Sequence, residues 1–261
     1  HGLVGPDGAG KSTLIRIAVG ALQPAQGTVR VLGRSPADPA LRARLAYMPQ
    51  GFALYLDLSV QENLEFFADL HGLSQVVSQR RIRELPTRTG LEGFEARRAG
   101  HLSGGMMQKL ALACALISEP RVMFLDEPTT GVDPLSRRSF WRLLDGVRAE
   151  GVAVLYATAN IDEAERCDHI AFLDGGRLTR QGTPTELAAA GDALLVSVTG
   201  PNARGYRRAL RELKDVSLVF PVGTRLHVWL EPGLPLTAFR TALATISPEL
   251  AAEPITPTLH D

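Results

Sequence analysis

A glycine-rich segment near the beginning of the chain has the composition and spacing of a phosphate-binding loop. The pattern G-x-x-x-x-G-K-[ST] is met by the segment Gly5-Pro6-Asp7-Gly8-Ala9-Gly10-Lys11-Ser12, which Thr13 follows. Glycines let the backbone N–H groups of such a loop turn inward around phosphates, and the next helix offers its positive end. Lys11 would reach the β- and γ-phosphates, and Ser12 would ligate Mg²⁺. We therefore expect this segment to bind ATP together with Mg²⁺.

The lysine at position 11 is informative because lysine is rare in this chain. Lys+Arg total 28, and only three of these residues are lysine. A compact ammonium fits between phosphate oxygens where the planar guanidinium of arginine would not. The alternative is a glycine turn without a ligand. The lysine, and the place of the loop between a strand and a helix, argue against that alternative.

Two acidic residues close an apolar run in the middle of the chain. The run Val122–Leu125 reads as a buried strand, and Asp126 and Glu127 follow it directly. Asp126 would support Mg²⁺, and Glu127 would polarise the water that attacks the γ-phosphate. Taken alone, such a pair is as readily a solvated strand end. In a chain that also has a phosphate-binding loop, the pair predicts nucleotide hydrolysis.

A second helix start offers another place for a phosphate. Ser103 stands where a helix would begin, and Gly104 and Gly105 leave backbone amides of the first turn accessible. This helix is not the one that begins at Lys11. The chain is therefore expected to contain two separate phosphate-binding features.

These residues need a scaffold in which strands and helices alternate. Short apolar strands are predicted at residues 2–4, 28–32, 45–48, 122–125 and 152–156. Helices are predicted after Lys11, after Ser103 and between Pro134 and Gly151, where Asp133 is the N-cap. This alternation predicts an α/β fold of the P-loop nucleoside triphosphatase (NTPase) type, with a mainly parallel sheet.

Two further parts are expected around this scaffold. Residues 51–118 read as an inserted helical subdomain, with Ser59 as a helix cap. A hairpin around Asp174 comes near the end of the ATP-binding domain, which we place at 1–187. Residues 192–261 are expected to form a small α+β domain, with strands at 194–199, 216–220 and 225–230 and helices at 204–213 and 236–246.

The charge and composition of the chain exclude some classes of partner. Lys+Arg and Asp+Glu both total 28, so the formal net charge is +0 and there is no general attraction to nucleic acid. Arg204, Arg208 and Arg211 would share one helix face, which is more often a solvated face than an RNA site. The longest apolar run, Leu110–Ile117, is too short to cross a membrane. We therefore expect no nucleic-acid partner and no membrane span in this segment.

The motifs resemble, in content and order, those of the ATP-binding subunit of ABC transporters. They read GPDGAGKST, LSGGMMQ and VMFLDEP. Gln50 is similar to the glutamine of the family's Q-loop, and Gly131-Val132-Asp133 is similar to its D-loop. The resemblance covers Gly2 to about Leu187. The segment from Tyr47 to Leu73 looks most like the multidrug or ABC-2 type of exporter.

The resemblance implies that two ATP-binding domains pair head to tail at the cytoplasmic face of a membrane. The loop of Ser103, Gly104 and Gly105 in one domain would close over ATP held by the loop of Lys11 in the other. The D-loop with Asp133 and the glutamine Gln50 would also reach the nucleotide, and Gln50 would sense Mg²⁺ and water. Hydrolysis would drive a permease, which selects the exported substrate. The second domain would be another copy, a related subunit or a fused part of one chain.

Two departures from the family pattern change what is expected of this chain. The switch histidine that would follow the strand at 152–156 is replaced by Ala159, so its own site is expected to hydrolyse ATP slowly. The family's upstream strands, with an aromatic residue that stacks on adenine, would precede His1. A family tail that begins near Ile255 would continue past Asp261. The sequence therefore reads as a fragment, which would fit half of a chain with two ATPase domains.

Two other functions are compatible with the motifs. An ABC-type ATPase that repairs DNA would need a long coiled coil between Gln50 and Ser103, where only 52 residues lie. One that acts on ribosomes usually brings basic linkers, which this chain lacks. A regulatory module that binds ATP and scarcely hydrolyses it is favoured by Ala159 and opposed by Glu127. ATP-powered export is the leading hypothesis.

Overall fold

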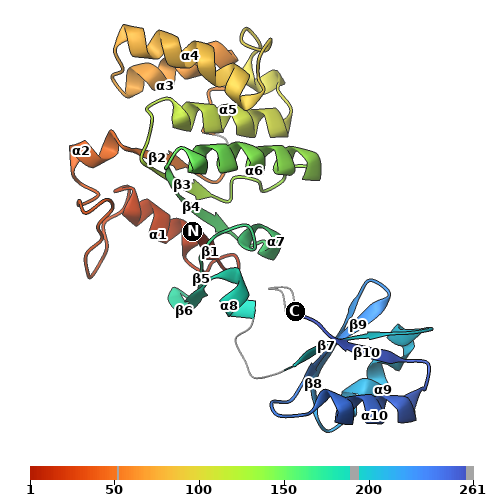
Figure 1. Ribbon diagram of the computed structural model, residues 1–261. Coiled ribbons are helices and arrows are strands. Elements are labelled where there is room, and N and C mark those ends of the chain that lie inside the picture. The colour runs from red at the N-terminus through yellow and green to blue at the C-terminus, as the bar shows by residue number, and fades with distance from the viewer. Residues whose placement is uncertain (52, 189–193, 257–261) are drawn as a thin grey trace. The chain divides into compact units, whose positions relative to one another are not determined.

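The computed structural model describes residues 1–51, 53–188 and 194–256, and Figure 1 shows its helices and strands. The chain divides into two compact units. The first contains His1–Ala164 and Ile170–Thr179, and the second contains Glu165–His169 and Arg180–Asp261. This division falls earlier along the chain than the boundary expected between 187 and 192, where residues 189–192 lie outside the described part.

The first unit is built on a six-stranded sheet in the order β2-β3-β4-β1-β5-β6. The pairs β2 with β3, β3 with β4, β4 with β1 and β1 with β5 are all parallel. The predicted α/β class with a mainly parallel sheet is confirmed. The strands are β1 (Gly2–Val4), β2 (Leu45–Met48), β3 (Val122–Asp126), β4 (Ala153–Thr158), β5 (Ile170–Asp174) and β6 (Arg177–Gly182).

The strands that carry the candidate site residues lie inside this sheet. All 5 residues of β3 are buried, which explains why its first four residues, Val122–Leu125, are all apolar instead of alternating with polar ones. Because β1, β3 and β4 are parallel, their carboxyl ends meet at one edge of the sheet. That edge is where the loop before Lys11, the acidic residue Glu127 and Ala159 follow their strands.

Helices cover both faces of the sheet (Figure 1). α1 (Lys11–Ala18) packs Ile15 in one cluster with Phe124 of β3. Phe124 is in register with Leu155 of β4, so the next residue, Tyr156, points to the other face. There the ring of Trp141 in α6 (Pro134–Ala149) lies 4.5 Å from that of Tyr156 between centroids. Among the described residues, no helix is both long and apolar enough to span a membrane.

Helices also occupy the stretch that follows β2. α3 (Val60–Leu70) begins with a capping box, in which Ser59 Oγ accepts from Glu62 N at 3.1 Å and Glu62 Oε2 accepts from Ser59 N at 2.7 Å. Leu64 and Ala68 of α3 are fully buried, whereas Phe67 is half-buried. The remaining helices of this unit are α2 (Pro39–Arg42), α4 (Gln75–Thr89), the 3-10 turn η1 (Ala99–His101), α5 (Gly104–Leu116) and α7 (Ile161–Ala164).

Two predicted strands of this unit differ from the structure. In the described chain the run 28–32 forms no strand, because only Val31 pairs, as an isolated bridge with Arg34. Leu32 and Gly33 have positive φ angles of 50° and 75°, so the chain reverses there before a strand can form. β4 extends two residues beyond the predicted end at 156, because its last residue, Thr158, still pairs with β1.

The second unit contains an antiparallel four-stranded sheet in the order β10-β7-β9-β8. Val196 and Val228 of this sheet share a buried core with Leu210 and Phe239 of the helices. The elements are α8 (Pro184–Ala188), β7 (Leu195–Thr199), η2 (Ala203–Tyr206), α9 (Arg207–Arg211), β8 (Val216–Val222), β9 (Arg225–Leu230), α10 (Leu236–Ile246) and β10 (Ala251–Pro254).

Two details of this unit differ from the sequence-based prediction. The strand β10 was not expected, because its alanines and proline are poor strand formers, and it forms through pairing with β7. The helix predicted at 204–213 is in two pieces, so Arg204 lies in η2 while Arg208 and Arg211 lie in α9. Arg208 pairs with Glu212 at 3.1 Å, and its side chain is 93% exposed. This exposed ion pair agrees with a solvated face.

Candidate nucleotide-binding site

The loop between β1 and α1 has a backbone that requires its glycines. Gly8 and Gly10 have φ angles of 80° and 103°, in the left-handed region that other residues rarely adopt. A Cβ atom on Gly5 would lie 2.1 Å from the carbonyl oxygen of Leu173 in β5. Gly8 and Gly10 therefore permit the turn, and Gly5 permits the close approach of β5.

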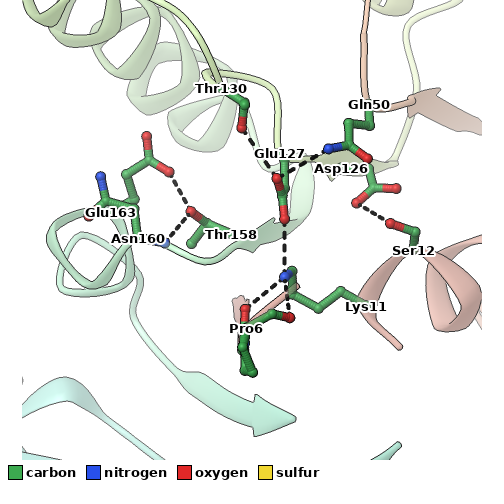
Figure 2. A network of polar contacts seen from close by, with 11 residues as sticks. Pro6, Lys11, Ser12, Gln50, Asp126, Glu127, Thr130, Thr158, Asn160 and Glu163 are labelled. Atoms are coloured by element: carbon green, nitrogen blue, oxygen red, sulfur yellow. Dashed lines mark hydrogen bonds and ion pairs between the residues drawn. The ribbon is translucent and has the colours of Figure 1, made fainter. Parts of the chain in front are cut away.

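Lys11 is buried at the first position of α1, and its ammonium has partners from two segments. Lys11 Nζ donates to the carbonyl oxygens of Gly5 at 2.7 Å and Pro6 at 3.1 Å. It also forms an ion pair of 3.0 Å with Glu127 Oε1, beyond the end of β3. Figure 2 shows these contacts converging on the ammonium. The structure thus brings together the lysine predicted to bind phosphate and the acidic residue predicted to be catalytic.

Ser12 and Asp126 form a second contact between the loop and β3. Asp126 is fully buried, and its Oδ1 accepts from Ser12 Oγ at 3.0 Å. Burial raises the pKa of Asp126, while the hydrogen bond from Ser12 lowers it and the charge of Glu127 raises it further. Asp126 Oδ2 is buried with no hydrogen-bond partner among the described residues. A divalent cation would supply that partner, so the donor set of Ser12 and Asp126 fits Mg²⁺.

Glu127 is held by contacts on both of its sides. Its φ angle of 50° is unusual for a non-glycine residue, and its amide donates to Ala157 O at 3.0 Å. Glu127 Oε2 accepts from Gln50 Nε2 at 3.4 Å and from Thr130 Oγ1 at 3.3 Å (Figure 2). The Q-loop glutamine expected from the resemblance therefore contacts the carboxylate expected to act on water.

A cavity of about 260 Å³ brings most of the predicted residues together. Its lining consists of Asp7–Thr13 with Gln50 and Glu127. Gly5, Pro6 and Asp126 adjoin it through their contacts with Lys11 and Ser12. Within the described part of the chain, the predicted residues outside this lining include Ser103, Gly104, Gly105 and Asp133.

The Ser103 segment begins α5 as the sequence indicated. Ser103 Oγ accepts from Met106 N at 3.3 Å, so this serine is the N-cap. A Cβ atom on Gly104 would meet no atom within 4 Å, whereas one on Gly105 would lie 2.2 Å from Ser136 Oγ in α6. Gly104 thus leaves the helix start open. Gly105 has a packing role that the sequence did not reveal, because it lets α5 approach α6.

Replacing Gly105 by alanine is expected to destabilise the first unit, because the new methyl group would collide with both Oγ and Cβ of Ser136. Overpacking of this kind costs about 1–3 kcal/mol. Gly104→Ala is the matched control, since it adds the same methyl group one position earlier into open space. Urea unfolding of the two variants measures the difference. Equal midpoints would show that the close contact with Ser136 carries no energy.

Asp133 is the N-cap of α6. Its Oδ1 accepts from the amides of Leu135 and Ser136, both at 3.0 Å. Hydrogen bonding from Ser136, through its side chain and its amide, lowers the pKa of Asp133. The predicted capping role is therefore observed. The D-loop role of this aspartate toward a nucleotide stays a prediction.

Ala159 follows β4 directly and is exposed. The next residue, Asn160, also lies beyond the end of β4, which is at Thr158. Asn160 N donates to Thr158 Oγ1 and Asn160 Oδ1 accepts from Asp162 N, both at 2.9 Å. The side chain of Asn160 is thus engaged at the beginning of α7.

Several polar residues that support this site were not expected from the sequence. Thr130 contacts Glu127 and could have been suspected, because a hydroxyl three residues after an acid in a turn can reach back to it. Thr129, Thr158 and Glu163 form a buried network behind the site, which no local spacing reveals. Residues joined only by tertiary contact have no signature in a single sequence.

A parallel sheet with a phosphate-binding loop between β1 and α1, and an acidic pair at the end of β3, defines a P-loop nucleotide-binding domain. The family model described as ABC transporter matches residues 1–130. The chain is 37% identical over 223 residues to a daunorubicin resistance ATP-binding protein of Streptomyces coeruleorubidus, covering 84% of this chain and 71% of that protein. The chain therefore belongs to the ABC transporter family, as an ATP-binding domain.

Two further comparisons agree with this assignment. The chain is 45% identical over 215 residues to a probable multidrug ABC transporter ATP-binding protein of Escherichia coli, covering 80% of this chain. It spans 37% of the length of that relative. A solved structure described as the ATP-binding subunit of an ABC transporter matches with a TM-score of 0.64 at 34% identity, over 72% of this chain and 80% of that one. Both the fold and the overall sequence thus agree with the family.

Proposed function

We propose that this chain binds and hydrolyses ATP with Mg²⁺ and so powers the export of a substrate through a separate membrane permease. The observation that carries the proposal is the position of Lys11 Nζ, 3.0 Å from Glu127 Oε1, in a cavity that Gln50 also lines. A phosphate-binding cation, a carboxylate for water and an amide that reaches this carboxylate lie together there. Relatives named for multidrug transport and daunorubicin resistance support export as the process. The subunit would work at the cytoplasmic face of the membrane.

The contacts of Lys11 indicate how binding would prepare hydrolysis. A γ-phosphate is a strong partner for an ammonium group, so ATP is expected to draw Lys11 away from Glu127. The carboxylate of Glu127, still held by Gln50 and Thr130, would then be available to orient and polarise the attacking water. Mg²⁺ would supply charge neutralisation at the β- and γ-phosphates, with Ser12, Asp126 and Gln50 as its protein ligands or supports.

A second ATP-binding domain is part of the proposal. Ser103 and Gly104 are exposed at the start of α5 and do not line the cavity of Lys11 in the described chain. A helix start with an open first turn suits a phosphate brought by another molecule. We therefore assign the Ser103 loop to the nucleotide held by the partner domain, with Asp133 at the same interface. Whether the partner domain is another copy or a fused part of one chain does not affect this geometry.

The segment after Gln50 is the proposed contact with the permease. We place this surface at Phe52–Leu73, of which Phe52 lies outside the described residues. Tyr55, Leu56 and Leu70 are 48%, 50% and 67% exposed, which is high for large apolar side chains. A groove of about 260 Å³ lies between the end of β2, α3 and α5, and its lining includes Met48, Phe67 and Ala111. An amphipathic segment of a permease would fit this apolar groove.

Hydrogen bonds fix the loop that contains Tyr55 and Leu56, as is needed of a surface that couples movements of the permease to the ATP-binding domain. The side chain of Asn63 is fully buried and donates to the carbonyl oxygens of Tyr55 at 3.0 Å and Ser59 at 2.8 Å. It also accepts from Tyr55 N at 2.9 Å. On its other side, Leu56 O accepts from Gly100 N at 2.9 Å, three residues before Ser103. A displacement of Leu56 would therefore be transmitted through these hydrogen bonds to Gly100, close to the beginning of α5.

Photo-crosslinkers placed at Leu56 and Leu70 in a membrane-assembled complex are expected to attach to the permease. The matched control is Val76 in α4, an apolar side chain that is 80% exposed and lies outside the proposed surface. Mass spectrometry of the adducts identifies the partner. The alternative is that the aromatic residues of this segment fill only the subdomain's own core, as the 4.4 Å packing of Tyr55 on Phe66 suggests for part of them. Adducts confined to this chain would favour that alternative.

ATP hydrolysis by the full-length protein with and without its permease tests the function as a whole. Stimulation by the permease is the expected result. Stimulation by ribosomes or DNA, with no effect of the permease, would indicate the second class of function. ATP binding without hydrolysis in any of these mixtures would indicate the regulatory module that Ala159 favours.

A further inference from the structure

A buried carboxylate lies behind the nucleotide site, on the short helix α7. Glu163 is 4% exposed. Thr158 Oγ1 donates to its Oε2 at 2.6 Å, and Thr129 Oγ1 donates to its Oε1 (Figure 2 shows the first of these contacts). Thr129 Oγ1 is also 2.9 Å from the hydroxyl of Tyr156, which must be the donor because the threonine proton goes to Glu163. Arg137 Nε lies 3.6 Å from Oε1.

The partners of Glu163 come from three segments that border the site. Thr129 is two residues after Glu127, in the turn where Thr130 N donates to Glu127 O at 3.2 Å. Thr158 is the last residue of β4, directly before Ala159. Arg137 lies in α6, the helix that Asp133 caps. One carboxylate therefore joins the segments that carry the proposed catalytic glutamate, the switch position and the D-loop.

This junction matters because Glu127 has a backbone conformation that needs support. A non-glycine residue with a φ angle of 50° costs energy, and it persists when the surrounding structure fixes it. The amide of Glu127 donates a hydrogen bond to the carbonyl oxygen of Ala157 in β4. In the turn that follows, Thr129 donates a hydrogen bond to Glu163. Burying a charge for fold stability alone is seldom favourable, whereas a satisfied buried network can specify one geometry.

We propose that Glu163 is a positioning residue for ATP hydrolysis, which fixes the turn at residues 127–130 so that the carboxylate of Glu127 points at the site. The inference rests on the proposed function. Glu163 does not line the nucleotide cavity in the described structure, so its loss should change turnover and leave nucleotide affinity unchanged. If Glu163 had a purely structural role, its loss would lower the stability of the protein and would not change kcat separately from nucleotide affinity.

The test replaces Glu163 by glutamine in the full-length assembled transporter, with the partner domain's catalytic glutamate inactivated so that one site is followed. Both the unsubstituted chain and an Ala159→His background are measured, because the second is expected to be faster. We expect single-turnover hydrolysis to fall about tenfold or more, as a small misplacement of a catalytic group can cause. The Kd for a non-hydrolysable ATP analogue should stay within about twofold, and amide exchange at 127–132 should become faster. Glu212→Gln, in an exposed ion pair of α9, is the control for the change of side chain.

A second pair of variants covers the case in which Glu163→Gln does not fold. Thr129→Val removes the hydroxyl and keeps the shape, and is expected to slow hydrolysis, while Thr129→Ser keeps the hydroxyl and should hydrolyse ATP faster than Thr129→Val. Unchanged turnover in Glu163→Gln, or a parallel loss of nucleotide affinity, would overturn the positioning role while leaving the proposed function intact. No hydrolysis by the unsubstituted or the Ala159→His chain would overturn the proposed function, and the positioning role with it.

Discussion

Replacing Lys11 by alanine is expected to weaken ATP binding by about thirtyfold or more. Removing one partner from a buried, hydrogen-bonded charge contact costs about 2–5 kcal/mol, and each 1.4 kcal/mol is a factor of about ten in affinity. Lys11 is buried and lines the cavity, where the carbonyl oxygens of Gly5 and Pro6 hold its ammonium, and a phosphate would take the place of Glu127 as its ionic partner. Titration with a fluorescent ATP analogue measures the change.

The control for this substitution is Lys214→Ala, because Lys214 is exposed and belongs to the second unit. It removes the same charge from the chain without touching the loop. The comparison is made between variants of one full-length protein, so that any contribution of other segments to absolute affinity cancels. Equal affinity of Lys11→Ala and Lys214→Ala for the analogue would refute the assignment of the loop.

The residues that could be predicted from the sequence are those whose role depends on local spacing. Lys11 and Ser12 follow a glycine pattern whose function is determined within eight positions, and Glu127 follows a strand whose first four residues are apolar. Their meeting in one cavity follows from parallel strands, whose carboxyl ends share an edge. The motif and the fold class together were therefore sufficient to place these side chains near one another.

The residues that could not be predicted depend on contacts between distant segments. Glu163 reaches Thr129 across 34 positions, and a buried glutamate in a short helix looks like any polar residue in the sequence. Gly105 was expected to leave backbone amides accessible to a phosphate. Because it has no Cβ atom, it also lets Ser136 of α6 pack closely against α5. The strand predicted at 28–32 was wrong because β-propensity is a local signal, and it does not show that the backbone turns at Leu32, where φ is positive.

Replacing Ala159 by histidine is expected to raise ATP turnover at this site by about a hundredfold. Deleting one hydrogen-bonding group that stabilises a transition state costs about 3 kcal/mol, and the missing imidazole is such a group by the resemblance to the family. The backbone on either side is already held, since Thr158 is bonded to Glu163 and Asn160 caps α7. A histidine would thus enter a preformed loop. Single-turnover hydrolysis in the full-length assembly measures the gain.

Asn160→His is the matched control, because it places the same imidazole one residue further along. Asn160 caps the amide of Asp162, so a histidine there would lose a cap without facing the nucleotide. We expect no gain from it. A gain of similar size from both variants would mean that an added imidazole acts through general charge instead of a defined position.

Ser103→Ala is expected to distinguish the two sites of the proposed asymmetric pair. If the chain's own site is slow for want of a histidine, the main contribution of this domain is the Ser103 loop that it offers to the partner's nucleotide. Ser103→Ala should therefore impair hydrolysis at the partner's site, whereas Glu127→Gln should change total turnover little. The opposite result, in which Glu127→Gln alone abolishes all hydrolysis and the partner's equivalent glutamate is dispensable, would make this site the main source of turnover.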